Sequence, residues 1–429
     1  MPWPEGAPRA SDPPRARTLP GPAGGTSFRR MDPDTVARPD AQLPAPGRRP
    51  RVVYGITVPQ SAATLLRGQL GWFREQGWDV QLVTSPGGPL DAVVERERVT
   101  VHPLPMQRDT DLLRDAVALV RWVVLLRRLR PDVLNVGTPK AGLLGCLAGW
   151  ATRVPVRVYV MRGLRLEGAR SRLQRTVLWL VERLTVLLAT EVVCVSHSLR
   201  EEAAARRLFG LRDRPIVLGE GSSNGVDPDR WDRGFAAVDR DAVRAGWGMA
   251  PEDLVVGFVG RMAFDKGVQD LLAAARSLED LPVRLVLLGP VEDEELRGAI
   301  AELGDRVTRI EDWTFDLDHV YVGIDVLCLP TRREGFPNVV LEAALAEVPS
   351  ITTTATGARD SVVPDVTGWL VETGDVGQLA AAVRACAADR AGVRAAGRAA
   401  RERALRDFRP TTIWSGLESV YRGGRTDVR

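Results

Sequence analysis

The sequence has little cysteine, lysine and histidine. Its four cysteines lie far apart among 429 residues and form no Cys-x-x-Cys pair, which argues against a zinc site and a disulfide framework and fits a reducing cytoplasm. Only Lys140 and Lys266 are lysines in a chain rich in arginine. We expect a retained lysine to stand where a compact ammonium group is needed, although two chance survivors would give the same count.

Long hydrophobic runs are also lacking. No run of about eighteen uncharged apolar residues occurs, which argues against a transmembrane helix. The nearest candidates, residues 116–126 and 176–188, are interrupted by Arg121 and by Glu182 and Arg183. Both stretches are flanked by arginine, so each is expected either to pack as a helix on a sheet or to lie on a membrane surface. The N-terminal residues also lack an apolar stretch of secretory-signal length, so export is not expected.

The charges nearly balance, because 58 basic residues stand against 55 acidic ones, for a net charge of +3. Residues 1–50 hold eight arginines and five acidic residues and therefore carry the whole excess. The rest of the chain lacks the basic surplus of a general nucleic-acid binder. The same segment contains twelve prolines and few large apolar side chains, which predicts a disordered leader.

Short β-rich runs alternate with amphipathic helical stretches from residue 51 onwards. In the first half of the chain, strands are predicted at residues 51–57, 79–85, 132–137, 156–160 and 191–196, and helices at 62–76, 111–130, 140–150, 171–189 and 198–207. The pattern restarts with strands at 254–260, 283–289, 306–310, 325–329 and 348–352, and helices at 267–278, 292–303, 338–347 and 375–406. Such alternation predicts right-handed βαβ units and parallel sheets.

The length, the 45% hydrophobic content and this repeated pattern predict an α/β protein with two doubly wound, Rossmann-like domains that face a cleft. We expect a first domain over residues 51–226, a linker over 227–250 and a second domain over 251–406. A C-terminal helix and tail over 407–429 are expected to cross back to the first domain. Ligands should bind in the cleft beyond the carboxyl ends of the strands.

The most informative segment is residues 334–342, with the sequence EGFPNVVLE, which follows the strand predicted to end at Leu329. A glycine-containing turn that leads into a helix presents free N–H groups and the helix dipole to the cleft, as a bound diphosphate requires. Glu342 lies one turn into the helix and can accept hydrogen bonds from ribose hydroxyls, while Glu334 can reach a sugar ring. The alternative is that both carboxylates merely favour the start of a helix.

A second segment, residues 260–267, has the sequence GRMAFDKG and follows the predicted strand LVVGFVG. It places Arg261 and Lys266 at another glycine-flanked helix entry. Together these cations are suited to neutralise a diphosphate leaving group as its charge develops. A solvated surface pair is the alternative.

Together the G-R pair, the D-K-G sequence, the EGFPNVVLE segment and the alanine-rich helix after it resemble the signature of glycosyltransferase family 4, whose members are retaining enzymes of the GT-B fold. The resemblance covers residues 254–372. It implies that the second domain binds a nucleotide sugar, with a UDP-sugar favoured over a GDP-sugar. The site residues that it implies are Arg261 and Lys266 on the diphosphate, Glu334 on the donor sugar, Glu342 on the ribose, Glu311, Asp312 and Trp313 beside the nucleobase, and Gly335, Phe336, Pro337, Asn338 and Val339 at the helix entry.

Stretches of the first domain resemble one subgroup of this family, the bacterial polysaccharide and glycan-assembly transferases. They are the sequences TPKAGLLG, MRGLR, CVS and GEGSSNGVD, at residues 138–145, 161–165, 194–196 and 219–227. Such enzymes act on polyprenyl-diphosphate-linked saccharides at the cytoplasmic membrane face, which implies an acceptor of that kind. Lys140, Arg162 and Arg165 lie just beyond predicted strands and are expected to hold the acceptor diphosphate. Folding contacts between the domains are the alternative for these residues, above all for Arg165.

No positioned histidine base is predicted, because many relatives carry a histidine where this chain has Arg162. His197 follows a strand, but a surface position is favoured over one in the cleft. His102 is expected to be structural, and His319 to lie in a helix near the nucleobase site. A retaining transfer can proceed without such a base, since the departing phosphate oxygen can take the acceptor proton on the same face.

Two Asp-x-Asp sequences, at residues 109–111 and 316–318, have the letters of a divalent-metal site. Each stands where a helix is predicted to begin, so N-terminal capping explains it better. Helix dipoles and cationic side chains are expected to take the place of a metal, and no cofactor is expected.

The sequence therefore predicts a hexosyltransferase that moves a sugar from a nucleotide diphosphate to a saccharide acceptor in cell-surface polysaccharide biosynthesis. It is expected at the inner face of the cell membrane, in peripheral contact with anionic lipid and without a nucleic-acid partner. A nucleotide-sugar epimerase of the same fold would need acid and base groups in the first domain. A nucleotide-sugar-binding protein without catalysis would be expected to lose Glu334 or Lys266, and both are present.

Overall fold

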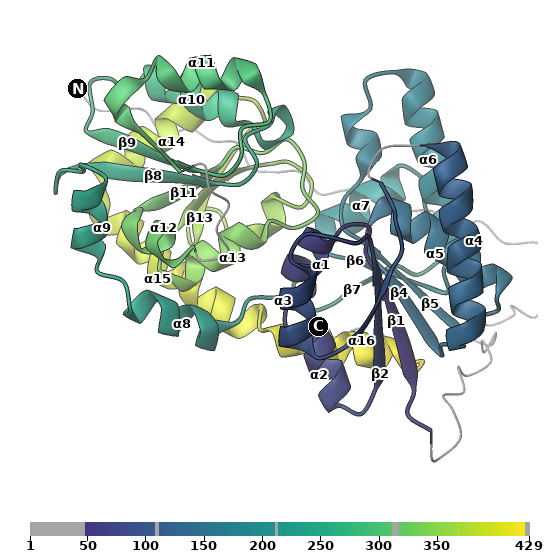
Figure 1. Ribbon diagram of the computed structural model, residues 1–429. Helices are drawn as coiled ribbons and strands as arrows, with labels where there is room; N and C mark the ends of the chain where they lie inside the picture. The colour runs from purple at the N-terminus through teal and green to yellow at the C-terminus, as the bar shows by residue number, and fades with distance from the viewer. Residues whose placement is uncertain (1–47, 108–110, 211–212, 311–316, 425–429) are drawn as a thin grey trace, which may run out of the picture. The chain divides into compact units, whose positions relative to one another are not determined.

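The computed structural model describes residues 48–107, 111–210, 213–310 and 317–424, and these residues belong to one compact unit. Two parallel sheets are built from the two halves of the chain (Figure 1). The strand order is β3-β2-β1-β4-β5-β6-β7 in the first sheet and β10-β9-β8-β11-β12-β13 in the second. Each order reverses direction once, between β1 and β4 and between β8 and β11, which confirms the prediction of two doubly wound α/β domains.

The strands are short, and the central ones are buried on both faces. All six residues of β8, LVVGFV, are buried, as the continuous apolar runs of parallel strands require. The first sheet consists of β1 (Arg51–Gly55), β2 (Asp79–Thr84), β3 (Thr100–Pro103), β4 (Val133–Val136), β5 (Val156–Met161), β6 (Glu191–Cys194) and β7 (Ile216–Val217). The second consists of β8 (Leu254–Val259), β9 (Val283–Leu288), β10 (Val307–Ile310), β11 (Val326–Leu329), β12 (Ser350–Thr353) and β13 (Gly368–Val371).

Helices connect successive strands and cover the sheets. In the first half these are α1 (Pro59–Leu65), α2 (Gln69–Glu75), α3 (Leu90–Glu97), α4 (Leu112–Leu129), α5 (Pro139–Ala151), the 3₁₀ turn η1 (Arg165–Gly168), α6 (Arg172–Leu188) and α7 (His197–Ala205). In the second half these are α8 (Pro228–Ala236), α9 (Arg240–Gly246), η2 (Phe264–Lys266), α10 (Val268–Arg276), α11 (Glu294–Ala301), η3 (Gly304–Arg306), α12 (Asp318–Gly323), α13 (Asn338–Leu345), η4 (Arg359–Ser361), α14 (Val376–Ala388), α15 (Arg390–Asp407) and α16 (Pro410–Tyr421).

The single helix predicted over residues 62–76 is wrong, because two helices meet there at Gly68. Gly68 has φ 77°, in the left-handed region that interrupts a helix. Glu97 stabilises the break, since its carboxylate accepts the N–H groups of Gly68 at 2.8 Å and Gly71 at 2.9 Å. The start of α2 is therefore stabilised by Glu97, a side chain of the later helix α3.

Several elements were not predicted. They include the helix α3 and the edge strands β3, β7 and β13. The segment expected to be a linker, residues 227–250, contains α8 and α9, which pack against α12 and α13. Trp231 anchors α8 through an edge contact with Tyr321, with ring centroids 5.4 Å apart.

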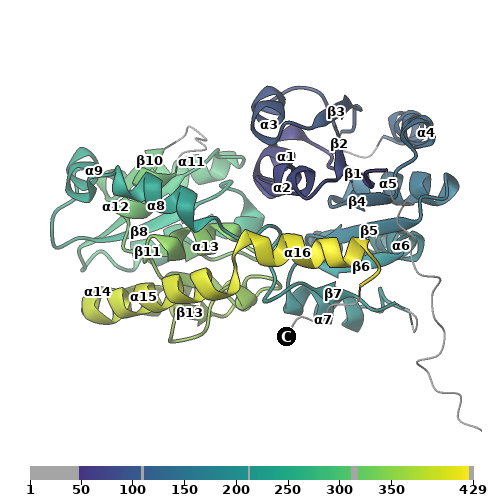
Figure 2. The same ribbon diagram turned by 90° about the horizontal axis from the view of Figure 1, so that it is seen from below.

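The C-terminal chain crosses back to the first domain, as predicted (Figure 2). The helix α15 packs on α13 of the second domain, and α16 packs on α2 of the first. Buried at the end of α16, the hydroxyl of Tyr421 accepts the amide of Asn135 at 2.5 Å and donates to the hydroxyl of Tyr54 at 3.0 Å. Nε1 of Trp78 donates to Glu418 at 3.2 Å.

Apart from the residues whose placement is not described, no helix of this protein is long and apolar enough to cross a membrane.

Candidate active site

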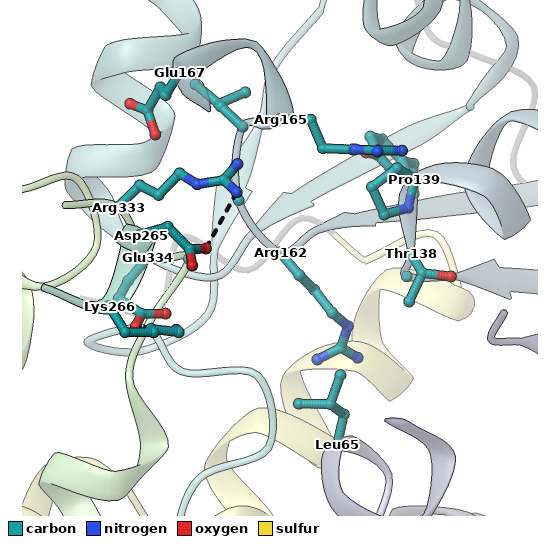
Figure 3. Close-up of a pocket in the computed structure, with 15 residues that line it drawn as sticks. Leu65, Thr138, Pro139, Arg162, Arg165, Glu167, Asp265, Lys266, Arg333 and Glu334 are labelled. Atoms are coloured by element: carbon teal, nitrogen blue, oxygen red, sulfur yellow. Dashed lines mark hydrogen bonds and ion pairs between the residues drawn. The ribbon is translucent and has the colours of Figure 1, made fainter. Parts of the chain in front are cut away.

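A cavity of about 290 Å³ lies at the carboxyl ends of strands from both sheets (Figure 3). Its walls are the segments that follow β4 and β5 in the first sheet and β8 and β11 in the second. The cavity therefore meets both points where the strand order reverses, which is where doubly wound sheets bind ligands. The residues that line it are Leu65, Gly137, Thr138, Pro139, Tyr159, Arg162, Gly163, Leu164, Arg165, Glu167, Asp265, Lys266, Arg333, Glu334 and Gly335.

Arg162, directly after β5, supplies the central cation of this cavity. Its Nε and Nη1 atoms are buried and have no hydrogen-bond partner. Burial lowers the pKa of the guanidinium to about 10, against the opposing effect of Tyr421 and Tyr54, so the group stays charged at neutral pH. In Figure 3 the side chain extends across the cavity toward Leu65. A buried cation with unsatisfied donors is suited to an anionic ligand.

Lys266 and Glu334 form an ion pair on the side of the second sheet. The hydroxyl of Thr331 also donates to Glu334, at 3.3 Å. The two loops that carry the pair touch through backbone, because a Cβ on Gly267, where φ is +71°, would lie 1.9 Å from the carbonyl oxygen of Pro330. Because glycine has no Cβ, the two loops can approach this closely, and Lys266 lies beside Glu334.

The loop that carries Glu334 also touches the first domain through its backbone. A Cβ on Gly335 would lie 2.2 Å from the carbonyl oxygen of Arg162. The hydroxyl of Ser196, at the start of α7, donates to the carbonyl oxygen of Gly335 at 2.7 Å. The N–H of Glu334 donates to the carbonyl oxygen of Thr356 at 2.9 Å. These contacts hold the backbone of the loop that carries Glu334 against the segment that carries Arg162.

Glu167 and Arg333, which no sequence motif predicts as site residues, also line this cavity. Glu167 accepts the hydroxyl of Thr356 at 2.8 Å, and its second oxygen is buried without a hydrogen-bond partner. Burial raises the pKa of this carboxyl, and the hydrogen bond from Thr356 opposes the shift. Arg333 pairs with Asp265 at 3.2 Å. Their signal in the sequence is only that each lies within two residues of a predicted site residue.

A second cavity, of about 480 Å³, shares Leu65 with the first and is lined by Asn338, Val339 and Glu342 of α13. Glu342 accepts the hydroxyl of Tyr321 at 2.7 Å, and burial raises the pKa of its carboxyl. The other walls include Arg67, Asn224, Arg230, Trp231 and Trp414. Of the predicted donor residues, Lys266, Glu334 and Gly335 line the first cavity, and Asn338, Val339 and Glu342 line the second.

The remaining predicted residues lie elsewhere. Phe336 and Pro337 are buried and line neither cavity. Lys140 does not line the first cavity and forms an ion pair with Asp115 of α4 at 2.7 Å. Arg261 is likewise outside its lining and pairs with Glu292. The three residues predicted beside the nucleobase, Glu311, Asp312 and Trp313, lie outside the described residues.

None of the three histidines lines either cavity, and neither does Asp111 of the first Asp-x-Asp sequence. His197 begins α7 and lines neither cavity, and His319 is exposed on α12. His102 lies on the edge strand β3, with Nε2 at 2.8 Å from the side-chain oxygen of Gln81, which fits the structural position predicted for it. Asp111 caps α4 by accepting a backbone N–H, as predicted. In the described part of the chain, no group of three or more His, Cys, Asp or Glu side chains is placed to hold a metal ion.

The geometry suits recognition of a phosphorylated sugar. Arg162 and Lys266 reach one cavity from different sheets, so that anionic groups can be bound from both sides. Glu334, which is paired with Lys266, also lines this cavity, and its carboxylate can accept hydrogen bonds from hydroxyl groups.

Comparison with known proteins identifies the family. Residues 62–219 match the "Glycosyl transferase 4-like domain", and residues 253–389 match "Glycosyl transferases group 1". The capsular polysaccharide biosynthesis glycosyltransferase CapM of Staphylococcus aureus is 32% identical over 378 residues, which cover 86% of this chain and 96% of CapM. The chain belongs to glycosyltransferase family 4. This family 4 enzyme is a hexosyltransferase, as the resemblance of its motifs implied.

Other relatives agree with this placement of the family 4 enzyme. The UDP-Gal:alpha-D-GlcNAc-diphosphoundecaprenol alpha-1,3-galactosyltransferase of Escherichia coli is 23% identical over 310 residues, which cover 70% of this chain and 77% of the relative. Among solved structures, Alr3699/HepE of Anabaena in complex with UDP and glucose superposes with a TM-score of 0.71 at 19% identity, over 86% of this chain and 98% of HepE. At that identity the likeness shows the fold, which is GT-B.

Proposed function

We propose that this family 4 glycosyltransferase moves a hexose from a UDP-sugar to a saccharide carried on polyprenyl diphosphate, with retention of the anomeric configuration, during assembly of a capsular or related cell-surface polysaccharide. The names of CapM and of the E. coli galactosyltransferase support the pathway and the acceptor class. The UDP bound by HepE supports the donor class. An acceptor of this kind would bring the enzyme into peripheral contact with the inner face of the cell membrane.

One observation carries the proposal: Arg162, whose Nε and Nη1 atoms are buried without a hydrogen-bond partner, lines a cavity that Lys266 lines from the other sheet. We assign Arg162, with Arg165 beside it, to the diphosphate of the acceptor. Lys266 and the N-terminus of α13 are assigned to the diphosphate of the donor. Two separate anions would thereby be held on the two walls of one cleft.

The chemistry follows from this assignment. The bond between the anomeric carbon and the diphosphate oxygen breaks while the acceptor oxygen forms its bond on the same face. The departing phosphate oxygen takes the acceptor proton, and Lys266 stabilises the developing negative charge. We propose that no metal takes part, so added chelator should leave the rate unchanged.

The test follows release of UDP from UDP-hexoses, with and without a polyprenyl-diphosphate-linked saccharide. Acceptor-dependent release with an anomerically retained product is expected. Arg162→Gln should raise the KM for the lipid-linked acceptor more than the KM for the donor, while Arg276→Gln, on an exposed side chain paired with Glu302, should match the wild type. Epimerised nucleotide sugar without UDP release, or binding of nucleotide sugar with no reaction, would overturn the proposal.

A further inference from the structure

Two helices of the first domain expose long apolar stripes to solvent. Of the fifteen exposed large apolar side chains among the described residues, ten lie on α4 and α6. Their exposed fractions range from 42% for Leu184 to 82% for Leu112. The ten are Leu112, Leu113, Val117, Val120 and Val124 on α4 and Leu173, Val177, Leu180, Leu184 and Leu187 on α6.

Helical periodicity aligns these side chains. Apart from Leu112, successive members are three or four residues apart, so each set runs along one side of its helix. The opposite sides are buried: α4 buries Ala118, Trp122 and Leu126, and α6 buries Thr185 and Val186. Both helices pack against α5, which lies between them (Figures 1 and 2). Ten exposed large apolar side chains on two helices form a surface of the kind that normally marks an interaction site. We call these ten side chains the paired stripes.

The paired stripes begin beside the first cavity. Lys140, in the first turn of α5, forms an ion pair with Asp115 in the first turn of α4, and the two residues before Lys140 line the cavity. The turn η1 contributes Arg165 and Glu167 to the cavity wall and leads within a few residues to the start of α6. The most exposed leucines, Leu112, Leu113 and Leu173, therefore lie at the cavity ends of their helices.

The charges beside the stripes are mainly basic, and the one acidic side chain next to Leu112, Asp111, is paired with Arg114. Exposed arginines follow α4 residues of the stripe by three or four positions, as Arg121 follows Val117 and Arg128 follows Val124. The only acidic residues within α4 and α6 are Asp115, which is paired with Lys140, and Glu182, which is buried. A second copy of this surface would bring arginine against arginine, whereas anionic lipid headgroups complement it.

We propose that the paired stripes insert into the surface of an anionic bilayer, with the flanking arginines on lipid phosphates. This inference rests on the proposed lipid-linked acceptor and deepens it by naming the surface that meets the membrane. Docked in this way, the cavity end of each helix lies near the bilayer, where a polyprenyl diphosphate would emerge. Apolar contact supplies the strength of binding, and the arginines select negatively charged lipid.

The experiment measures flotation of the full-length protein with vesicles of phosphatidylcholine alone and of phosphatidylcholine mixed with phosphatidylglycerol. Preferential binding to the mixed vesicles is expected. The double variant Val120→Asp, Leu180→Asp should lose affinity by at least about tenfold, because each aspartate opposes insertion. The matched control is Val366→Asp, a 53% exposed valine of the second domain, which should bind as the wild type does.

The arginines are tested separately. Arg121→Gln with Arg128→Gln should leave binding less sensitive to salt, since fewer charges remain for the ions to screen. The thermal midpoint of every variant is measured, so that unfolding is not mistaken for loss of docking. Unchanged binding of the folded double aspartate variant would overturn the proposal. A dimer that this variant converts to monomer, without vesicle binding by the wild type, would instead assign the stripes to an interface between copies.

Activity measurements separate this inference from the proposed function. The double aspartate variant should retain UDP release with a soluble acceptor analogue while its rate with vesicle-embedded lipid acceptor falls. If the wild type binds anionic vesicles through the stripes but transfers sugar to no lipid-linked acceptor, the proposed function fails and the docking surface stands.

Discussion

Arg162 and Lys266 bring positive charge to the first cavity from two different sheets. Arg162 follows β5, and Lys266 follows β8. Lys266 pairs with Glu334, whereas Arg162 has two donors without a partner. The pairing orients the ammonium group, since Glu334 is itself held by its backbone N–H to Thr356. The two cations are therefore expected to contribute differently to the reaction.

Replacing Lys266 with alanine should lower kcat on the order of a hundredfold. Loss of one preorganised donor to a developing negative charge commonly costs that much. The thermal midpoint should change little, because the lysine lies at the cavity wall and not in the core. Steady-state kinetics and a thermal melt measure both quantities, with Arg276→Ala as the control. A variant with half the wild-type kcat would exclude the role in leaving-group stabilisation.

Glu182 gives the protein a pH-dependent stability. It is buried on the inner side of α6, where the hydroxyl of Tyr159 donates to it at 2.6 Å. Burial raises the pKa of this carboxyl to about 7 from 4.5, although the hydrogen bond from Tyr159 opposes the shift. The folded protein therefore holds a proton that the unfolded chain has released, and the free energy of unfolding falls as the pH rises between these two values.

Glu182→Gln should remove this dependence, because the amide keeps an acceptor for Tyr159 without ionising. The stabilisation relative to wild type should be larger at about pH 8 than at about pH 5, by up to about 3 kcal/mol. Chemical denaturation at the two pH values measures the difference. Glu95→Gln, on an exposed side chain of α3, serves as the control. A difference that does not depend on pH would contradict the assignment.

At the scale of elements, the break between α1 and α2 depends on a residue of α3. Glu97 is 1% exposed and accepts two backbone N–H groups from the start of α2. Arg96 also donates to it, at 2.6 Å. The carboxylate thus acts as a cap supplied from a distant part of the sequence.

Glu97→Ala should lower the free energy of unfolding by roughly 2 kcal/mol or more, since it leaves the two N–H groups and the Arg96 guanidinium without their acceptor. Glu95→Ala, two residues earlier on the exposed side of α3, should change it by less than about 0.5 kcal/mol. Denaturant titration of both variants measures the contrast. Equal effects would show that Glu97 does not stabilise the start of α2.

At the scale of the whole molecule, α16 ties the end of the chain to the first sheet. Tyr421 meets Asn135 of β4 and Tyr54 of β1, and its ring lies 5.2 Å from that of Phe73. These partners are separated from Tyr421 by hundreds of residues. The last helix is therefore part of the core of the first domain.

Tyr421→Phe should destabilise the fold by about 1 to 3 kcal/mol, because the buried amide of Asn135 loses its acceptor. Ser415→Ala, on the exposed side of the same helix, should have an effect below about 0.5 kcal/mol. Thermal and denaturant unfolding of the two variants measure the difference. A Tyr421→Phe variant as stable as wild type would mean that the hydrogen bonds at this position contribute nothing net.

The sequence by itself determined the fold class and much of the cleft, because strands buried on both faces are continuous apolar runs, and parallel strands place their following residues at one edge. Arg162, Lys266 and Glu334, which were predicted in this way, all line the first cavity. Glu167 was not predicted, because it belongs to no recognisable motif and its only signal is that it lies two residues from Arg165. Lys140 and Arg261 were also predicted; neither lines the first cavity, and Lys140 pairs with Asp115 while Arg261 pairs with Glu292 and Asp265.

Only the tertiary structure decided which surfaces remain uncovered and which distant groups meet. The stretches 116–126 and 176–188 were compatible with helices packed on a sheet or lying on a membrane, and each buries one side while exposing an apolar other side. Helical periodicity aligns apolar residues but does not tell which side a neighbour covers. The break at Gly68, capped by Glu97, and the anchor at Tyr421 were hidden for the same physical reason: each depends on contacts between residues that are distant in the sequence and become neighbours only when the chain folds.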